Sequence, residues 1–272
     1  MKITREMLKA KNACVEGYRA FCEAYPEKEY PEGAEYQEVL DNCAENDKDE
    51  YAAWLIDMFG QTNGVRFIDG DLITDKSIFV CGRLEVTGKI ICKKYVRTGW
   101  GIKAGRGIKA GRGIKAGRGI KAGCGIEAGW GIEAGWGIKA GRGIKAGYGI
   151  EAGCGIEAGY GIEAGWGIKA GWGIKAGYGI EAGWGIKAGR GIKAGYGIEA
   201  GYGIEAGCGI EAGWGIKAGW GIKAGYGIEA GNNYGIYAGL NCTINSDYRF
   251  VRAKERPANL MCGKFEAVGN DE

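Results

Sequence analysis

The stretch Gly143-Ile-Lys-Ala-Gly-Tyr148 is followed directly by Gly149-Ile-Glu-Ala-Gly-Cys154, and this six-residue unit decides the fold of most of the chain. The unit recurs 22 times between Gly101 and Asn232, and only its third and sixth positions vary. A short, fixed period is typical of a solenoid, in which each repeat contacts only its neighbours. We therefore expect a regular β-solenoid over residues 101–232.

Within each unit, Ile, Lys or Glu, and Ala form a short strand, and Gly-x-Gly forms a turn. Alternation puts Ile and Ala inside and the charge outside. The charges indicate how many units, or hexads, close one coil, since opposite charges on neighbouring strands attract. A coil of three hexads gives 11 unlike and 8 like pairs, whereas a coil of two hexads gives 15 unlike and 5 like. The sequence thus predicts a mainly β, two-sided parallel β-solenoid with two hexads, or twelve residues, per rung.

The flanking segments differ from the regular array. Residues 1–60 carry 7 Lys/Arg against 14 Asp/Glu, and their apolar residues recur at helical spacing, so we expect a small acidic domain of three helices. A connector follows over 61–71. Degenerate capping repeats occupy 72–100, where Leu72, Ile78 and Leu84 lie six apart. We expect a C-terminal cap over 233–272, because the end of a solenoid needs covering.

Two outward positions among the degenerate repeats are apolar rather than charged. Phe79 and Ile91 lie two hexads apart, which in a two-sided coil places them on one sheet in adjacent rungs. An exposed apolar pair of this kind needs a cover. We predict that the helical domain docks on it.

Composition argues against catalysis and membrane insertion. The 272 residues include no His, which removes the commonest general base and metal ligand. We expect no enzyme activity and no cofactor or metal. No apolar run approaches the ~18 residues of a spanning helix, and the N-terminus lacks a secretory signal, so we expect a cytoplasmic protein. The 10 Cys are scattered, and we expect reduced thiols.

The sixth position of the unit, x, is mostly aromatic. Stacked one rung apart, these side chains would form ladders that either seal the turns, or bind copies of the chain or another protein, or stack on glycans or nucleobases. Trp, Tyr and Arg are enriched at protein interfaces. In a two-sided coil Trp136, Trp172, Trp184 and Trp220 share one edge. The candidate interface residues are Trp130, Trp136, Trp166, Trp172, Trp184, Trp214, Trp220, Tyr148, Tyr160 and Tyr196.

Residues 101–123 hold four Lys and three Arg and no acid. This segment is a candidate contact for a polyanion. The alternative interpretations are a solvated face or the counterpart of the acidic helical domain. The candidate polyanion contacts are Lys103, Arg106, Lys109, Arg112, Lys115, Arg118 and Lys121.

The segment Leu8-Lys-Ala-Lys-Asn-Ala-Cys14, followed by Glu16-Gly17, resembles the helical start of uncharacterised bacterial and phage-associated repeat proteins. In these a Gly/Ala-rich solenoid with Gly-Ile-x-Ala-Gly-x hexads follows. The ladders are also similar to those of bactofilins, which are polymer-forming β-helical proteins. Near-perfect repetition is also typical of a recently expanded or engineered array. The resemblance implies an architecture and no reaction.

These observations predict a non-enzymatic structural or interaction protein. The rigid rod would associate with itself, as an oligomer or fibre, or bind another protein, through its aromatic edges or its ends. The alternative is a binding module for a glycan or polyanion that uses the stacked Trp and Tyr residues and the basic segment 101–123.

Overall fold

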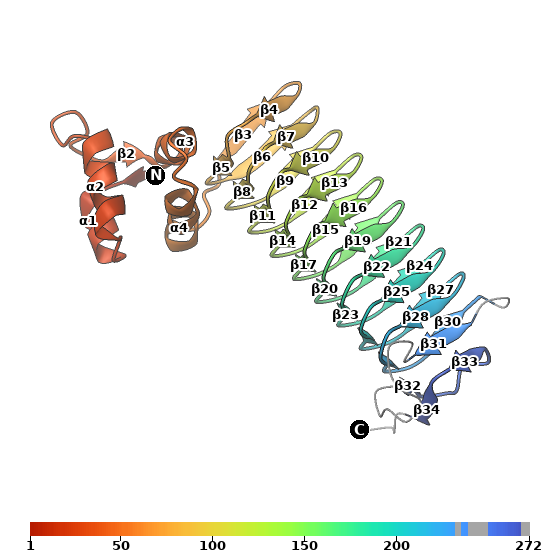
Figure 1. The fold of residues 1–272 in the computed structure, drawn as a ribbon. Helices are drawn as coiled ribbons and strands as arrows, with labels where there is room; N and C mark the ends of the chain where they lie inside the picture. Colours follow the sequence, from red (N-terminus) through yellow and green to blue (C-terminus); the bar gives the residue numbers. More distant parts are fainter. Residues whose placement is uncertain (232–234, 239–249, 268–272) are drawn as a thin grey trace.

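The structure, a computed structural model, describes residues 1–231, 235–238 and 250–267. A small helical domain lies at one end of a long β-solenoid (Figure 1). Its helices are α1 (Arg5–Ala10), α2 (Val15–Ala24), α3 (Tyr36–Glu45) and α4 (Asp49–Phe59), and a short antiparallel pair joins β1 (Lys2–Ile3) to β2 (Ala34–Glu35). The mainly β class, the parallel solenoid and the helical start are confirmed. The expectation of three helices is wrong, because Asn12 adopts a φ of 55° and separates α1 from α2.

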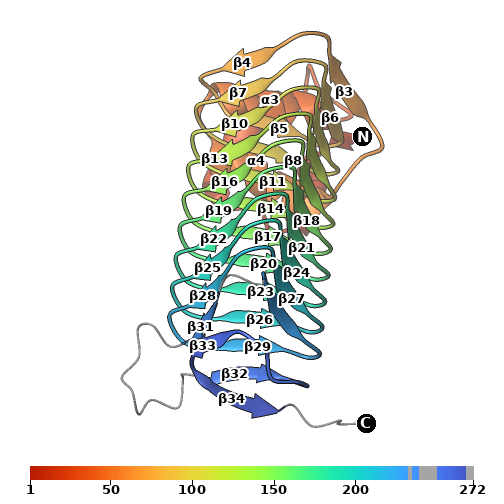
Figure 2. The same cartoon turned by 90° about the vertical axis from the view of Figure 1, so that its right-hand side faces the viewer.

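The solenoid has three sheets, which Figure 2 shows as three columns of strands. Sheet 1 runs from β3 (Val65–Ile68) through β6 (Arg83–Val86) to β30 (Ile228–Ala230). Sheets 2 and 3 start at β4 (Leu72–Thr74) and β5 (Ile78–Val80). Next come β7 (Ile90–Cys92) and β8 (Val96–Thr98), and from β9 (Ile102–Ala104) to β30 every strand is one Ile-(Lys/Glu)-Ala unit. The last strands are β31 (Ile236–Ala238), β32 (Phe250–Ala253), β33 (Leu260–Cys262) and β34 (Lys264–Ala267).

Each strand of the regular array pairs in parallel with the strand three hexads further along the chain, as Ile120 does with Ile138 and Lys109 with Glu127. The predicted two-sided coil of two hexads is therefore wrong: three hexads close one rung. Ile and Ala of every unit lie inside, 6% exposed or less, and form one continuous core. The alternation of buried and exposed positions was predicted correctly, but the number of sheets was not.

The geometry of the corners explains why three hexads, and not two, close one rung. The ladder of hydrogen bonds continues through Gly-x-Gly: Gly141 N donates to Ala122 O and Arg142 N to Cys124 O, both at 3.1 Å. The glycines with positive φ among the described residues are Gly33, Gly60, Gly70 and Gly263, so the regular corners contain none. Such a corner bends the chain without reversing it, and three bends close a coil. Exposed ion pairs contribute only about 0–1 kcal/mol each, so charge counts do not set the coil.

The solenoid begins earlier than predicted, and the predicted C-terminal cap is described only in part. The predicted connector, 61–71, contains β3, which pairs with β6 and begins sheet 1. The pattern missed it because Arg66 occupies the register position of Leu84, where the repeat has an apolar residue. Of the predicted cap over 233–272, residues 233–234, 239–249 and 268–272 lie outside the described residues, while β33 and β34 extend sheets 2 and 3.

Candidate functional site

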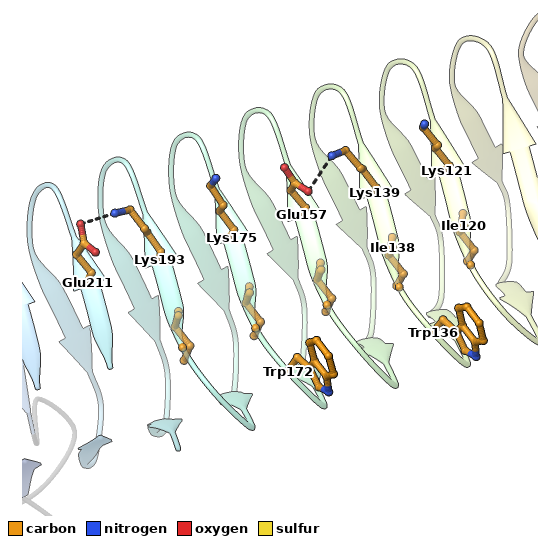
Figure 3. Close-up of a pocket in the computed structure, with 18 of the residues that line it drawn as sticks. Ile120, Lys121, Trp136, Ile138, Lys139, Glu157, Trp172, Lys175, Lys193 and Glu211 are labelled. Carbon is orange, nitrogen blue, oxygen red and sulfur yellow. Dashed lines mark hydrogen bonds and ion pairs between the residues drawn. The ribbon is translucent and has the colours of Figure 1, made fainter. Parts of the chain in front are cut away.

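The three hexads of each rung distribute the variable positions over three ridges and three faces. Face 1, face 2 and face 3 are the outer sides of sheets 1, 2 and 3. The x residues form ridge 1 between sheets 1 and 2, ridge 2 between sheets 2 and 3, and ridge 3 between sheets 3 and 1. A groove floored by Gly and Ile runs along each face, between one ridge and the row of Lys and Glu. Figure 3 shows this arrangement on face 1, where Trp136 and Trp172 lie across the Ile row from Lys139 and Glu157.

Ridge 2 is aromatic in six consecutive rungs. Trp130, Tyr148, Trp166 and Trp184 are each 51–53% exposed. Successive ring centroids lie 4.8–6.4 Å apart, and Trp166 and Trp184 are stacked at an interplanar angle of 5°. The rings hold one another in place, while the first four of them leave about half of their surface in water. The ridge consists of Arg112, Trp130, Tyr148, Trp166, Trp184, Tyr202 and Trp220.

The other two ridges are mixed. Ridge 1 has a shorter stack, in which Tyr178 lies 4.8 Å from Tyr196 between ring centroids. On ridge 3 the guanidinium of Arg118 lies 3.7 Å from the ring centroid of Trp100 and 4.9 Å from that of Trp136. Ridge 1 consists of Arg106, Cys124, Arg142, Tyr160, Tyr178, Tyr196 and Trp214, and ridge 3 of Trp100, Arg118, Trp136, Cys154, Trp172, Arg190, Cys208 and Tyr226.

The candidate interface residues therefore do not share one edge. Trp136 and Trp172 lie on ridge 3, whereas Trp184 and Trp220 lie on ridge 2, because corners that share a ridge are three hexads and not two hexads apart. Trp130, Trp166 and Tyr148 are also on ridge 2, and Tyr160, Tyr196 and Trp214 are on ridge 1. Sequence reasoning left out Tyr178 and Tyr202, which complete the stacks. Aromatic residues recurring at every third hexad are the signal that would have found them.

The basic segment 101–123 forms a girdle around the rod and not a single surface. Lys103 and Lys121 lie on face 1, Lys109 on face 2 and Lys115 on face 3, while Arg106, Arg112 and Arg118 lie on ridges 1, 2 and 3. Lys109 and Lys115 are paired with Glu127 and Glu133, at 3.0 and 2.9 Å between Nζ and Oε1. Face 1 alone has three successive lysines, Lys103, Lys121 and Lys139. The outer two also form ion pairs, Lys103 with Glu85 at 3.8 Å and Lys139 with Glu157 at 2.9 Å.

The outward charges form rows of exposed ion pairs. Lys169 Nζ lies 2.8 Å from Glu151 Oε1, and Lys145 Nζ lies 2.8 Å from Glu163 Oε1. In each case the hydrogen bond to the glutamate raises the pKa of the lysine. These charges lie in open rows, and the residues that the structure describes contain no group of three Cys, Asp or Glu placed to hold a metal ion.

The helical domain packs on sheet 3 around Phe79, and ion pairs with neighbouring basic residues hold it there. Phe79 is 2% exposed and lies in the same core as Leu40 and Leu55, and Gln37 Nε2 donates to Phe79 O at 2.8 Å. Ile91 lies on sheet 2, away from this core, because the two-hexad spacing that placed it beside Phe79 is wrong.

The acidic helical domain meets basic residues that precede the girdle. Asp41 pairs with Arg66 at 2.6 Å, Asp57 pairs with Arg97, and Asp47 accepts from Lys94 at 2.7 Å and from Lys76 at 3.1 Å. The hydrogen bonds from the two lysines lower the pKa of Asp47. The counterpart of the acidic domain is therefore 66–97, and residues 101–123 stay on the open part of the rod.

The comparisons with known proteins concern the helical domain alone. Residues 1–62 match the family model of the YdhT N-terminal domain. No curated protein and no solved structure matches the chain significantly. Among the described residues, no helix has the length and apolar character needed to cross a membrane. Nothing in these comparisons assigns a reaction or a ligand to the ridges.

Proposed function

We propose that this chain is a non-enzymatic structural and interaction protein, a rigid β-solenoid rod that associates with copies of itself through its aromatic ridges. Ridge 2 carries this proposal. Six consecutive rungs each present an aromatic side chain, and four of these side chains are about half exposed. A continuous apolar strip of this length is unusual on a monomer in water. Aromatic residues are also those that dominate the buried centres of protein interfaces.

The remainder of the proposal rests on the sequence. The absence of His removes the usual general base, and the carboxylates of the regular rungs are interspersed with lysines in open rows. The resemblance of the ladders to those of bactofilins, which form polymers, also favours assembly. The proposal also includes action in the cytoplasm. It includes association through the solenoid ends, or binding of a different protein, as further modes of interaction.

The test compares two ridges. Trp130→Ser, Trp166→Ser and Trp184→Ser together remove half of the ridge 2 rings, while Trp136→Ser and Trp172→Ser on ridge 3 form the matched control. We expect the wild-type chain and the control to associate as concentration rises, measured by sedimentation velocity and negative-stain microscopy. The ridge 2 variant should stay monomeric with an unchanged β circular dichroism spectrum. A wild-type chain that is monomeric at every concentration would refute the proposal.

A second candidate function is polyanion binding on face 1. Lys103, Lys121 and Lys139 follow one another at one-rung spacing, beside the Trp100–Arg118–Trp136 stack. Phosphate or sulfate groups along a polymer would meet this row. Glycan stacking is less favoured, because the stacked rings of ridge 2 turn their faces toward one another.

Salt dependence separates this candidate from simple association. We expect a single-stranded oligonucleotide or heparin to bind with an affinity that falls as salt rises, and Lys121→Glu to reduce the salt slope by about 1 or more. Lys109→Glu, which alters a lysine already paired on face 2, is the control. Binding that is equal in both variants would refute a site on face 1.

A further inference from the structure

Ridge 3 lacks an aromatic ring at one rung where both neighbouring rungs have one. Cys154 lies between Trp136 and Trp172, and the corner hydrogen bonds fix this order, from Cys154 N to Trp136 O and from Trp172 N to Cys154 O. The two indoles are 58% and 59% exposed, which makes them the most exposed of the nine Trp side chains. Figure 3 shows them projecting from the same ridge in a similar orientation. We call the space between them, above Cys154, the slot.

The slot has the size of one aromatic ring. Rungs repeat at ~4.8 Å, so the two indoles lie about 9.6 Å apart along the rod, and a ring placed midway would lie about 4.8 Å from each. On ridge 2 Tyr148 occupies the corresponding place between Trp130 and Trp166, at 6.4 and 5.8 Å between ring centroids. A flat ring inserted above Cys154 would therefore stack as the chain's own rings do.

Arginine side chains support the outer sides of the slot. Arg118 lies 4.9 Å from the ring centroid of Trp136, and Arg190 lies 4.9 Å from that of Trp172. Along ridge 3 both arginines are on the sides of the indoles that point away from Cys154. Within the described part of the chain no aromatic ring contacts either indole. The two sides that face Cys154 are thus the ones left open to a ligand.

The groove of face 1 supplies a positive charge beside the slot. Both indoles border this groove, whose floor consists of Gly and Ile. At the rung of Cys154 the outward residue is Glu157, which is bound to Lys139 at 2.9 Å, and the next outward residue is Lys175. Lys175 is exposed and forms no ion pair with any of the described residues. A ligand in the slot therefore finds an apolar floor next to its ring and an unpaired ammonium group one rung along.

We propose that ridge 3 and face 1 together bind a nucleotide, with its base stacked between Trp136 and Trp172 and its phosphate on Lys175. Every nucleobase has a flat π-face, and stacking of bases on aromatic side chains beside a basic groove is how single strands are bound without sequence preference. A free nucleotide and each unit of a single strand present the same chemistry. The inference goes beyond the association proposed for ridge 2, and it rests on the second candidate function, polyanion binding on face 1, for which it names the recognised group.

Other rings fit the slot less well. A pyranose ring is puckered and thicker than a nucleobase, and a neutral sugar brings no anion to Lys175. An aromatic side chain from a second copy also lacks an anionic group. A nucleotide combines the flat ring with the charge, and so matches both parts of the site.

The other two corner cysteines form no such slot. Cys124 on ridge 1 lies between two arginines, and Cys208 on ridge 3 lies between Arg190 and Tyr226. Neither has an aromatic ring on both sides. Cys208 therefore provides a control on the same ridge.

Filling the slot tests the proposal. Cys154→Tyr and Cys208→Tyr each convert Gly-Ile-Glu-Ala-Gly-Cys into Gly-Ile-Glu-Ala-Gly-Tyr, a hexad that the chain already contains at 155–160, so both variants should fold. Binding of a labelled oligo(dA) strand is measured by fluorescence anisotropy. We expect Cys154→Tyr to bind at least about tenfold more weakly than the wild-type chain, because the stacking of one base is lost, and Cys208→Tyr to bind like the wild-type chain. An abasic strand of the same length has the same phosphates and should bind all three proteins equally.

Reaction of the thiols with a maleimide, followed by mass spectrometry, shows where the ligand lies. Cys154 and Cys208 are both partly buried corner thiols, so their rates can be compared in one sample. A bound base should slow the reaction of Cys154 by about tenfold when the ligand is at about ten times its Kd, and leave Cys208 unchanged. Protection by AMP would show that a free nucleotide suffices, and protection by oligo(dA) alone would assign the slot to a strand.

Several results would overturn the assignment. Equal binding of oligo(dA) by the two Tyr variants, equal affinity of the wild-type chain for the abasic strand and oligo(dA), or binding of neither AMP nor oligo(dA) would refute a base in the slot. Protection of Cys154 only by a cello-oligosaccharide would assign the slot to a glycan, and protection that follows protein concentration alone would assign it to a second copy. Heparin binding that Lys121→Glu weakens would in each case leave polyanion binding on face 1 standing, so the two proposals fail separately.

Discussion

The corner glycines permit a sharp prediction, because the two glycines of each Gly-x-Gly have different surroundings. A Cβ atom added at Gly141 would lie 2.0 Å from Gly123 O of the preceding rung, whereas one added at Gly143 would lie 3.4 Å from Gly161 O. The first distance is impossible and the second is an ordinary contact. The substitutions Gly141→Ala and Gly143→Ala differ by two positions and add the same methyl group.

The cost follows from what must move. To bring the added methyl to ordinary contact, the two rungs must part by about 1.4 Å at this corner. The hydrogen bonds from Gly141 N and Arg142 N, both 3.1 Å long, would then be broken. Each broken backbone bond costs about 1–3 kcal/mol when its groups stay away from water, so Gly141→Ala should lose about 4 kcal/mol. Gly143→Ala should change stability by less than about 1 kcal/mol, including a gain of about 0.5 kcal/mol from the stiffer unfolded chain.

Hydrogen exchange measured by mass spectrometry is the appropriate assay, because stability in a solenoid is local and each rung opens with its neighbours. We expect Gly141→Ala to accelerate exchange over the rungs that contain Gly123 and Gly141, by about a thousandfold for about 4 kcal/mol. Gly143→Ala should leave the same peptides protected. Free energies of opening that agree within about 1 kcal/mol between the two variants would refute the role assigned to close backbone approach.

Two further predictions concern the helical domain. Phe79→Ala should weaken docking of the helical domain by about 3–5 kcal/mol and expose its helices to limited proteolysis. Phe67, which is 62% exposed at the equivalent outward position of sheet 1, provides the control, and Phe67→Ala should have no effect. Equal proteolysis of both variants would exclude Phe79 as the anchor. Burial raises the pKa of Cys43 to about 11, above its ordinary value of 9.0, so the folded state keeps a proton that the unfolded state loses, and stability present below pH 9 should decline between pH 9 and 11. Circular dichroism should show helix loss in this window ahead of β loss, and Cys43→Ala should reduce the slope; a helical signal that is constant to pH 11 would contradict it.

The sequence identified the strand unit, its inward and outward positions and the separate helical domain, since all three depend on local patterns. Ile and Ala alternate with a charged residue, and this alone places them in the core. The number of sheets depends on the angle of the Gly-x-Gly corner. The pairing of outward charges favours a coil of two hexads, which is wrong, because exposed ion pairs are too weak to decide between folds.

The wrong number of hexads per rung also limited what could be predicted of the candidate site. Trp136 and Trp184 lie at corners, as the Gly-x-Gly turn predicts, since the x position lies at a corner in either coil; that both are more than half exposed is a finding of the structure. Their assignment to one edge failed, because neighbours along a ridge depend on the length of the rung. Phe79 was identified from a missing outward charge, a local signal, whereas its pairing with Ile91 relied on the two-hexad spacing and did not hold.

The number of hexads per rung also determines how a deletion in the array would rearrange the side chains on the faces and ridges. Removing three hexads deletes one rung and leaves every downstream side chain on its own face and ridge. Removing one hexad keeps all strands, corners and core positions, because every hexad is equivalent in the interior, yet it moves each downstream side chain to a neighbouring face. If the hexad removed lies between Trp166 and Trp184, Trp184 would leave the stack it shares with Trp166, although the interior would still contain the same Ile and Ala contacts. The fold is thus indifferent to the order of the hexads, while the stack of ridge 2 exists only in this order, so any function that the ridges and faces perform is specified by the two variable positions of each unit.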